Sequence, residues 1–314
     1  MGFYGVTTPM IKDSSGVFLK CEFLHPGRSH KARVARHLVD DAEARGYIGG
    51  DSKRILLERT GGNLGVGLAM EARARGFPLT LVTDPSYSAA KRSLARRFGA
   101  TVLDRALSFP GCRDNGEAIN EILSREGDRY HYLDQFGNPA NPLTHESQTG
   151  PEIAEQLASF GVEPDATVVL VCGMGTGATM RGVSAALAQR FARVLKVAVQ
   201  PPNCELRSGR YAPHPFEGIA VGEPAPFVDV RELDDVIPVT VQQAARAHDY
   251  LIRRHRFDVG PSSLANVAAL LAMSGVNDRH DGHRDAARER HADRVFVTLL
   301  FDRGEDYASE TGFG

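Results

Sequence analysis

A single lysine, Lys31, stands where turn residues meet an amphipathic helix, in the stretch HPGRSHKARVARHLVDDAEARG that begins at His25. The chain has only six lysines among its 37 basic residues, so arginine carries most of the positive charge. A desolvated lysine amine can lose its proton and form a Schiff base, which a guanidinium cannot do. Lys31 is therefore a candidate nucleophile; the alternative is a solvated residue in the first turn of a helix.

The stretch VVLVCGMGTGATMRGVSAALAQRF (168–191) predicts a strand, a glycine loop and a helix, whose first N–H groups would favour an anion. Gly173, Gly175 and Ala178 fit the dinucleotide pattern G-x-G-x-x-A. However, the next predicted strand ends at Gln200, where a ribose needs an acidic residue, and no G-K-[ST] follows the loop. The pattern therefore favours a small phosphate cradle, with a tight turn that binds nothing as the alternative.

Two further turns carry polar side chains at expected helix starts. In LLERTGGNLGVGLAMEARARG (56–76), Asn63 either tolerates a left-handed bend or reaches a ligand, while the loop N–H groups hold a carboxylate. In DVGPSSLANVAALLAM (258–273), Ser262 or Ser263 caps the helix or faces a heteroatom of a bound ring. A phosphate cradle, a carboxylate nest, a hydroxyl and a lysine are together the set that pyridoxal phosphate requires.

Composition narrows the class of protein. The 314 residues suit one large α/β unit or two packed lobes, and 42% hydrophobic with 24% charged residues is ordinary for a globular protein. A net charge of −2 indicates no nucleic-acid or anionic-membrane partner. The start MGFYGVTTPM does not resemble a secretory leader, and no apolar run reaches membrane-spanning length. Four scattered cysteines without a CxxC pair favour a reduced, cytoplasmic protein with no metal site.

Short apolar runs alternate with helical patterns. Ala35, Leu38, Val39 and Ala42 fall on one helical face, and Val66, Ala69 and Met70 begin another. Such alternation predicts parallel sheets with helices on both sides. Strands are expected at residues 55–58, 79–83, 100–104, 167–172, 194–200 and 295–301.

The polar stretch NDRHDGHRDAARERHADR (277–294) is expected to be a solvated loop or helix before the last strand. Its His280, His283 and His291 could ligate a metal, but an exposed charged surface is the favoured interpretation.

These motifs, taken in order, resemble the cysteine synthase (O-acetylserine sulfhydrylase) and cystathionine β-synthase-like family of fold-type II pyridoxal-phosphate enzymes, over nearly the whole chain. HPGRSHKAR is similar to N-P-x-x-S-x-K-x-R, RTGGNLG to T-S-G-N-T-G, and DQFGNPANPLTHESQTGPEI (134–153) to Q-F-x-N-P-A-N-x-x-x-H-x-x-T-G-P-E-I. GMGTGATMRG resembles the phosphate loop, GPSSLA resembles G-I-S-S-G-A, and FDRGEDYAS resembles D-x-G-E-R-Y-x-S. FEGIA contains the glycine that lies beside the cofactor in the family.

The resemblance implies a role for each matching residue. Lys31 would form the Schiff base with pyridoxal 5'-phosphate, exchange the Cα proton and serve as the catalytic residue. Asn63 would contact the 3'-oxygen, Gly218 would lie beside the cofactor and Ser262 would face the pyridine nitrogen. The phosphate would be held by Gly175, Thr176, Gly177, Ala178 and Thr179, and the substrate carboxylate by Thr60, Gly61, Gly62, Leu64 and Gln135.

The chain departs from the family mainly at the substrate end. Gly61 stands for a serine and Leu64 for a threonine, so two hydroxyl donors are lost. Losing a hydrogen bond to a charged group costs about 1.5–3 kcal/mol, so the carboxylate is bound more weakly or in another pose. Arg28 and His30 flank the lysine where many relatives carry small or apolar residues, and Gln200 replaces a glutamate.

The implied fold is α/β, a two-lobed fold-type II pyridoxal-phosphate enzyme like tryptophan synthase β, with parallel sheets flanked by helices. Residues 1–34 and 134–314 would form the larger, cofactor-binding lobe, and residues 35–133 a smaller mobile lobe that closes over the substrate. A homodimer is expected from the resemblance alone.

The implied reaction is β-replacement on an activated L-serine, O-acetyl- or O-phosphoserine, through an aminoacrylate. A small nucleophile would add to give L-cysteine or another β-substituted alanine. A phosphorylated donor becomes plausible if Arg28, Arg181, Arg207 or Arg210 faces the site. The alternatives are a 2,3-diaminopropionate-type synthase that uses an amine nucleophile, and a serine/threonine dehydratase. A cofactor-bound but inactive partner protein and a nicotinamide enzyme are disfavoured.

Overall fold

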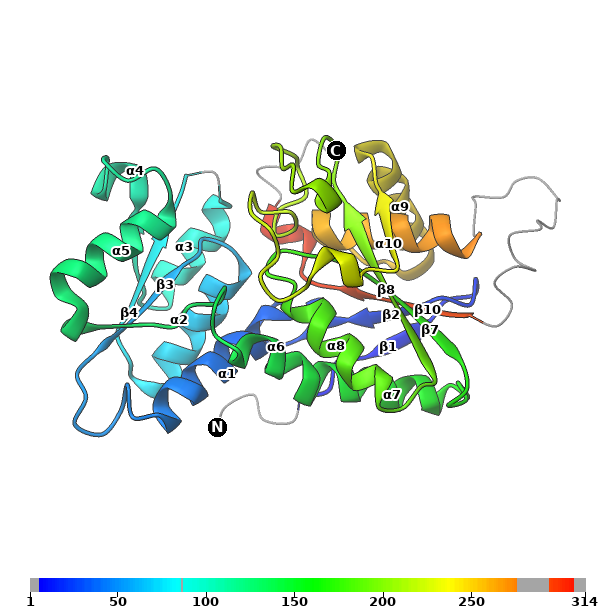
Figure 1. The fold of residues 1–314 in the computed structure, drawn as a ribbon, viewed down its shortest axis with the longest axis horizontal. Coiled ribbons are helices and arrows are strands. Elements are labelled where there is room, and N and C mark those ends of the chain that lie inside the picture. The colour runs from blue at the N-terminus through cyan, green and yellow to red at the C-terminus, as the bar shows by residue number, and fades with distance from the viewer. Residues whose placement is uncertain (1–5, 86, 276–293, 308–314) are drawn as a thin grey trace. The chain divides into compact units, whose positions relative to one another are not determined.

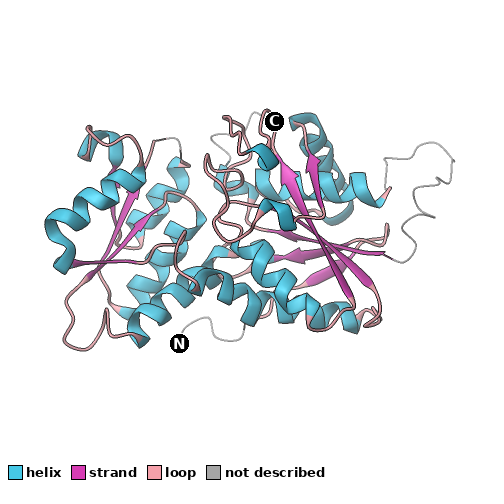
Figure 2. Cartoon of the chain, in the orientation of Figure 1, coloured by secondary structure: helices cyan, strands magenta, loops and turns pink. Residues whose placement is uncertain are grey.

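The computed structural model of the chain describes residues 6–85, 87–275 and 294–307. The chain divides into two compact units, each with its own sheet (Figures 1 and 2). Of the described residues, unit 1 contains Val6, residues 25–141 apart from 86, and residues 306–307, and unit 2 contains residues 7–24, 142–275 and 294–305. Unit 1 is wider than residues 35–133, the smaller lobe expected from the sequence, because it includes the lysine turn and the whole of the following helix.

Unit 2 is built on a six-stranded sheet. Its central strand β7 (Thr167–Gly173) reads TVVLVCG and is buried along nearly its whole length, as expected for a strand covered on both faces. Strand β1 pairs antiparallel with β2, and all the other described pairs in this sheet are parallel. The order is β1 (Met10–Lys12), β2 (Phe18–Cys21), β10 (Arg294–Leu300), β7, β8 (Arg193–Gln200) and β9 (Asp235–Pro238).

Helices cover both faces of this sheet. Because successive side chains of a strand point to opposite faces, β7 contributes to two separate cores. Val168 and Leu170 pack with α7 (Gly150–Ser159) and α8 (Ala178–Ala188). Val169 and Val171 pack with α9 (Val241–His255) and α10 (Pro261–Ser274).

Unit 1 has a four-stranded parallel sheet in the order β5 (Thr101–Asp104), β4 (Leu79–Thr83), β3 (Ile55–Arg59) and β6 (Tyr130–Tyr132). Leu56 and Leu81 pack against α1 (Lys31–Ala44) and α2 (Asn63–Arg75). Leu57 and Val82 pack against α5 (Asn115–Glu126) on the other face.

The remaining helices are short. They are α3 (Ala89–Arg97), α4 (Arg105–Ser108), α6 (Ala140–Thr144), a π-helical turn η3 (His145–Thr149), and 3₁₀ turns η1 (Glu22–Leu24), η2 (Gly127–Arg129), η4 (Leu206–Ser208), η5 (Val230–Glu232) and η6 (Gly304–Tyr307).

The α/β class, the parallel sheets and the flanking helices are confirmed, and each of the six expected strands is present with ends shifted by at most one residue. Strands β1, β2, β6 and β9, each of three or four residues, were missed. His280, His283 and His291 lie outside the described residues. In the described part of the chain, no group of acidic, histidine or cysteine residues could hold a metal ion.

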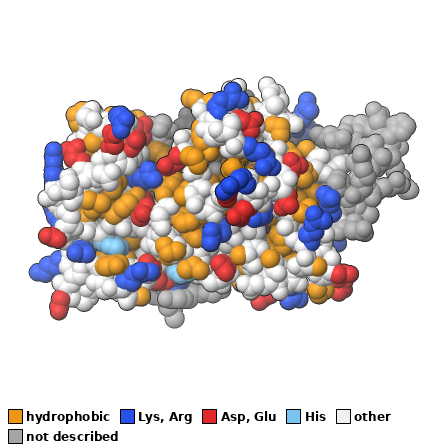
Figure 3. Space-filling model, viewed as in Figure 1, with side chains coloured by type: hydrophobic (Ala, Val, Ile, Leu, Met, Phe, Trp, Pro, Cys, Tyr) orange, Lys and Arg blue, Asp and Glu red, His pale blue; other side chains and the backbone are white. Residues whose placement is uncertain are grey.

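No helix among the described residues is long and apolar enough to cross a membrane. Basic and acidic side chains are interspersed on the face of the molecule drawn in Figure 3.

Candidate active site

Lys31 is the first residue of α1 and follows a tightly folded turn. The N–H of Gly27 donates to His25 Nδ1 at 3.0 Å, and the N–H of Arg28 donates to the His25 carbonyl at 2.7 Å. A Cβ at Gly27 would overlap Ala32 Cβ, so the turn requires glycine there. The lysine is therefore held at a defined helix start in unit 1, and its side chain is half-buried.

The carboxylate loop, residues 60–64, connects β3 to α2 in the same unit. The N–H of Thr60 continues the sheet by donating to the Val82 carbonyl at 3.0 Å, and Thr60 Oγ1 accepts from Gly62 N at 3.4 Å. Gly62 is the N-cap of α2 and has no side chain to cap it. The first N–H groups of α2, including those of Asn63 and Leu64, thus form an anion-binding helix start.

The two departures in this loop are filled by other side chains. A Cβ at Gly61 would overlap Thr83 Oγ1 and would lie 2.7 Å from Tyr87 Cβ. Leu64 is 2% exposed and packs in the core between α1 and α2. Other side chains therefore occupy the space of both missing hydroxyl groups. Because the Leu64 side chain is buried in the core, Leu64 can offer a ligand only its backbone. Thr83 and Tyr87 were missed from the sequence, because Thr83 ends the neighbouring strand β4 and Tyr87 follows that strand.

Gln135 braces the carboxylate loop. Its side-chain Nε2 donates to the Arg59 carbonyl at 3.1 Å, and its backbone N–H donates to Glu58 Oε2 at 3.1 Å. The Glu58 carboxyl also accepts from Arg59 N, and burial raises its pKa to about 8. The side chain expected to contact the substrate is thus tied to the end of β3. Glu58, which accepts the hydrogen bond from the Gln135 backbone, was missed from the sequence.

In unit 2, residues 175–179 form the glycine loop between β7 and α8. A Cβ at Gly175 would lie 2.6 Å from the Gly218 carbonyl oxygen, so the loop is shaped by a close backbone approach. Gly177 has φ +81° and is the N-cap of α8, with no side-chain cap. Within the loop, Ala178 N donates to Thr176 Oγ1 at 3.3 Å. The structure therefore brings Gly218 to the loop and leaves an uncapped helix start suited to a phosphate.

Two buried side chains fix this loop and were missed from the sequence. Thr179 Oγ1 lies 3.2 Å from His145 Nε2, whose Nδ1 lies 3.0 Å from Thr149 Oγ1. Asn266 Oδ1 accepts from Gly173 N at 2.7 Å, and Asn266 Nδ2 donates to the Leu299 carbonyl at 3.0 Å. His145 is the histidine of the motif at residues 134–153, so the sequence could have indicated it. No motif in the sequence includes Asn266.

The two serines of GPSSLA have different environments. The capping prediction is wrong for both, because Gly260 is the N-cap of α10 and Pro261 takes the first helical position. Ser263 Oγ accepts from Phe301 N at 2.8 Å and is structural. Within the part of the chain that the structure describes, the Ser262 hydroxyl has no hydrogen-bond partner, which leaves it available to a ligand atom.

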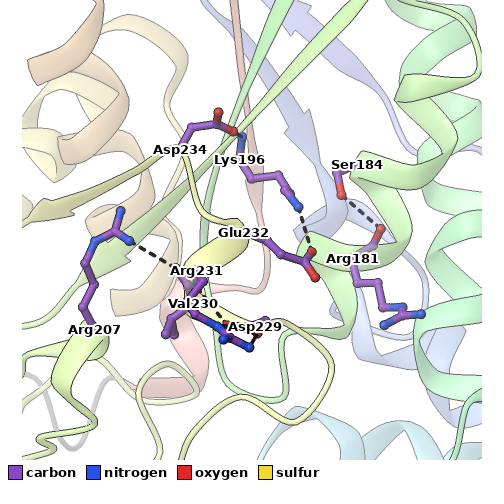
Figure 4. Close-up of polar contacts among 9 residues, drawn as sticks. All are labelled: Arg181, Ser184, Lys196, Arg207, Asp229, Val230, Arg231, Glu232 and Asp234. Atoms are coloured by element: carbon purple, nitrogen blue, oxygen red, sulfur yellow. Dashed lines mark hydrogen bonds and ion pairs between the residues drawn. The ribbon is translucent and has the colours of Figure 1, made fainter.

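The arginines considered for an anionic donor are engaged elsewhere or exposed. Arg207 donates to the carbonyls of Val230 and Leu233, both at 3.2 Å, and Arg210 is exposed beside its bridge to Glu205. Arg181, whose side chain is drawn in Figure 4, lines a cavity of about 460 Å³ together with residues of α8, of β8 and of the segment 227–232.

Phe227, one of the residues that line this cavity, also contacts the glycine loop. Lys196 Nζ pairs with Glu232 at 3.0 Å, and Lys196 N donates to Asp234 at 2.7 Å, which holds the 229–234 segment on β8 (Figure 4). Just before that segment, Phe227 N donates to the Thr176 carbonyl at 3.1 Å.

Comparison with known proteins shows the family of the chain. Residues 6–281 match the family model described as "Pyridoxal-phosphate dependent enzyme". The chain is 31% identical over 322 aligned residues to cysteine synthase A of Escherichia coli K12, covering 98% of this chain and 92% of the relative.

Solved structures give the same result. O-ureido-L-serine synthase superposes with a TM-score of 0.80 at 29% identity, covering 98% of this chain and 92% of that one. O-acetylserine dependent cystathionine β-synthase from Helicobacter pylori superposes with a TM-score of 0.80 at 25% identity, covering 98% and 95%. The protein therefore belongs to the cysteine synthase family of pyridoxal-phosphate-dependent enzymes.

Proposed function

We propose that this enzyme replaces the β-substituent of an activated L-serine, O-acetyl- or O-phosphoserine, and that Lys31 is its Schiff-base residue. The observation that carries the proposal is the glycine loop at residues 175–179, an uncapped helix start with left-handed Gly177, which fits the cofactor phosphate. The lysine at the start of α1 and the available Ser262 hydroxyl supply the other two attachments that the cofactor needs.

When bound, pyridoxal phosphate withdraws electrons from the amino acid Cα, which makes the α-proton acidic and lets a group leave Cβ. Lys31 Nζ takes that proton and later returns it. The Ser262 hydroxyl bonds the pyridine nitrogen, and Asn63 holds the 3'-oxygen. The N–H groups at the start of α2, together with Thr60, hold the substrate carboxylate. Gln135 keeps this loop in place through Arg59.

We also propose that the enzyme is specialised and differs in donor or nucleophile from a housekeeping cysteine synthase. Its carboxylate loop binds through backbone groups, because Thr83 and Tyr87 take up the space of a hydroxyl-bearing residue at Gly61. An amine nucleophile, giving a 2,3-diaminopropionate-type product, is the second candidate for the added group.

The smaller unit would close over the substrate to exclude water. The four unpaired, buried cysteines are compatible with a cytoplasmic location, and family membership supports a homodimer.

The test is an absorption spectrum of the purified enzyme, followed by additions of serine, O-acetylserine and O-phosphoserine. A visible band that is lost in Lys31→Ala but kept in Lys12→Ala, a substitution of an exposed lysine, would support the role of Lys31. The donor that shifts this band identifies the leaving group.

Steady-state assays with sulfide and with ammonia then identify the nucleophile, and keto-acid release without any nucleophile would indicate a dehydratase. A rate with O-acetylserine and sulfide that far exceeds every other pair would contradict the specialised role.

A further inference from the structure

The lysine turn contains an unusual backbone conformation. Arg28 has φ +73°, in the left-handed region that glycine favours and a long side chain rarely adopts. A strained residue that persists is held by its surroundings and points to a function. Arg28 lies three residues before Lys31.

The partner of Arg28 is Asp306, close to the last described residue of the chain. Arg28 Nη2 lies 2.5 Å from Asp306 Oδ1, with the two side chains 28% and 10% exposed. Residue 306 is aspartate where the family pattern D-x-G-E-R-Y-x-S has arginine. Both residues belong to unit 1, so the ion pair lies within that unit.

Asp306 is anchored on its other side as well. Ser88 Oγ donates to the Asp306 carbonyl at 3.0 Å, and the same Oγ caps α3 by accepting from Lys91 N. The Lys91 ammonium, 1% exposed, lies 3.6 Å from the centroid of the Tyr307 ring. The last described residues of the chain are therefore fixed to the start of α3.

This attachment reaches the carboxylate loop. Tyr87 immediately precedes Ser88, and its Cβ occupies the space beside Gly61. One route of direct contacts thus runs from the Lys31 turn through Arg28 and Asp306 to Ser88, and from Tyr87 to the substrate loop.

We infer that Asp306 is a positioning residue that acts through Arg28, and that their ion pair fixes the position of the lysine turn relative to the carboxylate loop. The inference rests on the proposed role of Lys31. The pair holds residue 28 in its left-handed conformation and so fixes the direction in which α1 begins. Through Ser88 it holds the segment that closes the space next to Gly61.

The test uses Asp306→Asn, Arg28→Gly, their combination, and the exchange Arg28→Asp with Asp306→Arg. Glycine adopts φ +73° more easily than arginine, so Arg28→Gly should remove the backbone strain of the turn as well as the ion pair. We expect Asp306→Asn and Arg28→Gly each to weaken pyridoxal phosphate binding by about tenfold, the effect of losing one charged hydrogen bond. Each should also raise KM for the donor several-fold more than it lowers kcat.

Because both single changes break the same ion pair, the combined variant should be no worse than either. The charge exchange should recover binding to within about threefold of the wild type. The control is Glu126→Gln, which removes an exposed ion pair of similar length, 2.6 Å, to Arg129 in unit 1. It should leave cofactor binding and KM unchanged.

Two results would overturn the inference. One is cofactor binding and KM that stay at wild-type values in Asp306→Asn, even if its melting temperature falls, which would make the pair merely structural. The other is a combined variant whose loss is the product of the two single losses. A visible band that persists in Lys31→Ala would instead overturn the proposed role of Lys31, and the inference with it.

Discussion

Each of the two glycine turns follows a buried parallel strand and opens an uncapped helix, but different side chains support them. The turn at residues 175–179 rests on Asn266, which is neutral at every pH and bonds Gly173 and Leu299. The turn at residues 60–64 rests on Glu58, whose carboxyl bonds Arg59 and Gln135. The two turns share a backbone arrangement, but the turn expected to bind the cofactor is held by a side chain that does not titrate. The turn expected to bind the substrate is held by a side chain that does.

The glycines of the two turns are also required for different reasons. Gly175 faces the backbone carbonyl of Gly218, which has little freedom to move. Gly61 faces the side chains of Thr83 and Tyr87, which can be changed by mutation. The cofactor turn is thus fixed by main chain against main chain, whereas the substrate turn is shaped by side chains that can vary with the substrate.

The largest effect is expected from Gly175→Ala. The new Cβ would lie 2.6 Å from the Gly218 oxygen, so the loop must shift and lose its N–H contacts to the phosphate. Losing two such charged hydrogen bonds predicts binding of pyridoxal phosphate about 100-fold weaker or worse, measured by spectral titration. Gly127→Ala, at a glycine with open space and φ −54°, is the control and should bind normally. Wild-type affinity in Gly175→Ala would mean that this close approach does not shape the phosphate site.

Gly61→Ser restores the residue that the family carries, yet it should impair this enzyme. The serine Cβ would overlap Thr83 Oγ1, so the loop must open away from β4. We expect KM for the donor to rise about tenfold, as for one lost charged hydrogen bond, with unchanged cofactor binding.

Adding Thr83→Ala should recover part of that loss, because it removes the overlapping hydroxyl. Gly111→Ser, at a glycine with nothing nearby, is the matched control. If Gly61→Ser lowered KM instead, the loop would be an impaired version of the family's loop and not a specialised one.

The sequence alone predicted those parts of the site that depend on local backbone geometry. Lys31 at a helix start and the glycine loop are visible because turn and glycine residues stand directly before a helical pattern, whereas Gly218 was expected only from the family resemblance. Thr83, Glu58 and Asn266 were missed, because each acts on a segment that approaches it only in the folded sheet. The strands that were found lie in apolar runs of four to eight residues, whereas the missed strands have only three or four residues.

Glu58→Gln should show that the stability of the enzyme depends on the protonation of the Glu58 carboxyl. The pKa of Glu58 is raised to about 8 by burial, from 4.5, so the folded state keeps a proton that the unfolded chain releases. The stabilising contribution is fully present below pH 4.5 and is lost as the pH rises through 8, with a slope of up to about 1.4 kcal/mol per pH unit. Urea unfolding between pH 6 and 9 should therefore show a smaller loss of stability in Glu58→Gln than in the wild type. Parallel pH profiles would indicate that Glu58 is charged in the folded enzyme.

The smallest effect is expected from Thr179→Val, and it separates two ways in which the cofactor turn could hold a phosphate. The Thr179 hydroxyl is paired with His145, so its role here is to fix the first turn of α8 while the backbone N–H groups bind the phosphate. Losing a neutral hydrogen bond to a positioned histidine predicts pyridoxal phosphate binding weaker by about threefold. Thr179→Ser, which keeps the hydroxyl, should bind like the wild type. A loss of tenfold or more in Thr179→Val would mean that the hydroxyl itself holds the phosphate. The cofactor turn would then depend on a side chain, as the substrate turn does, and the contrast between the two turns would disappear.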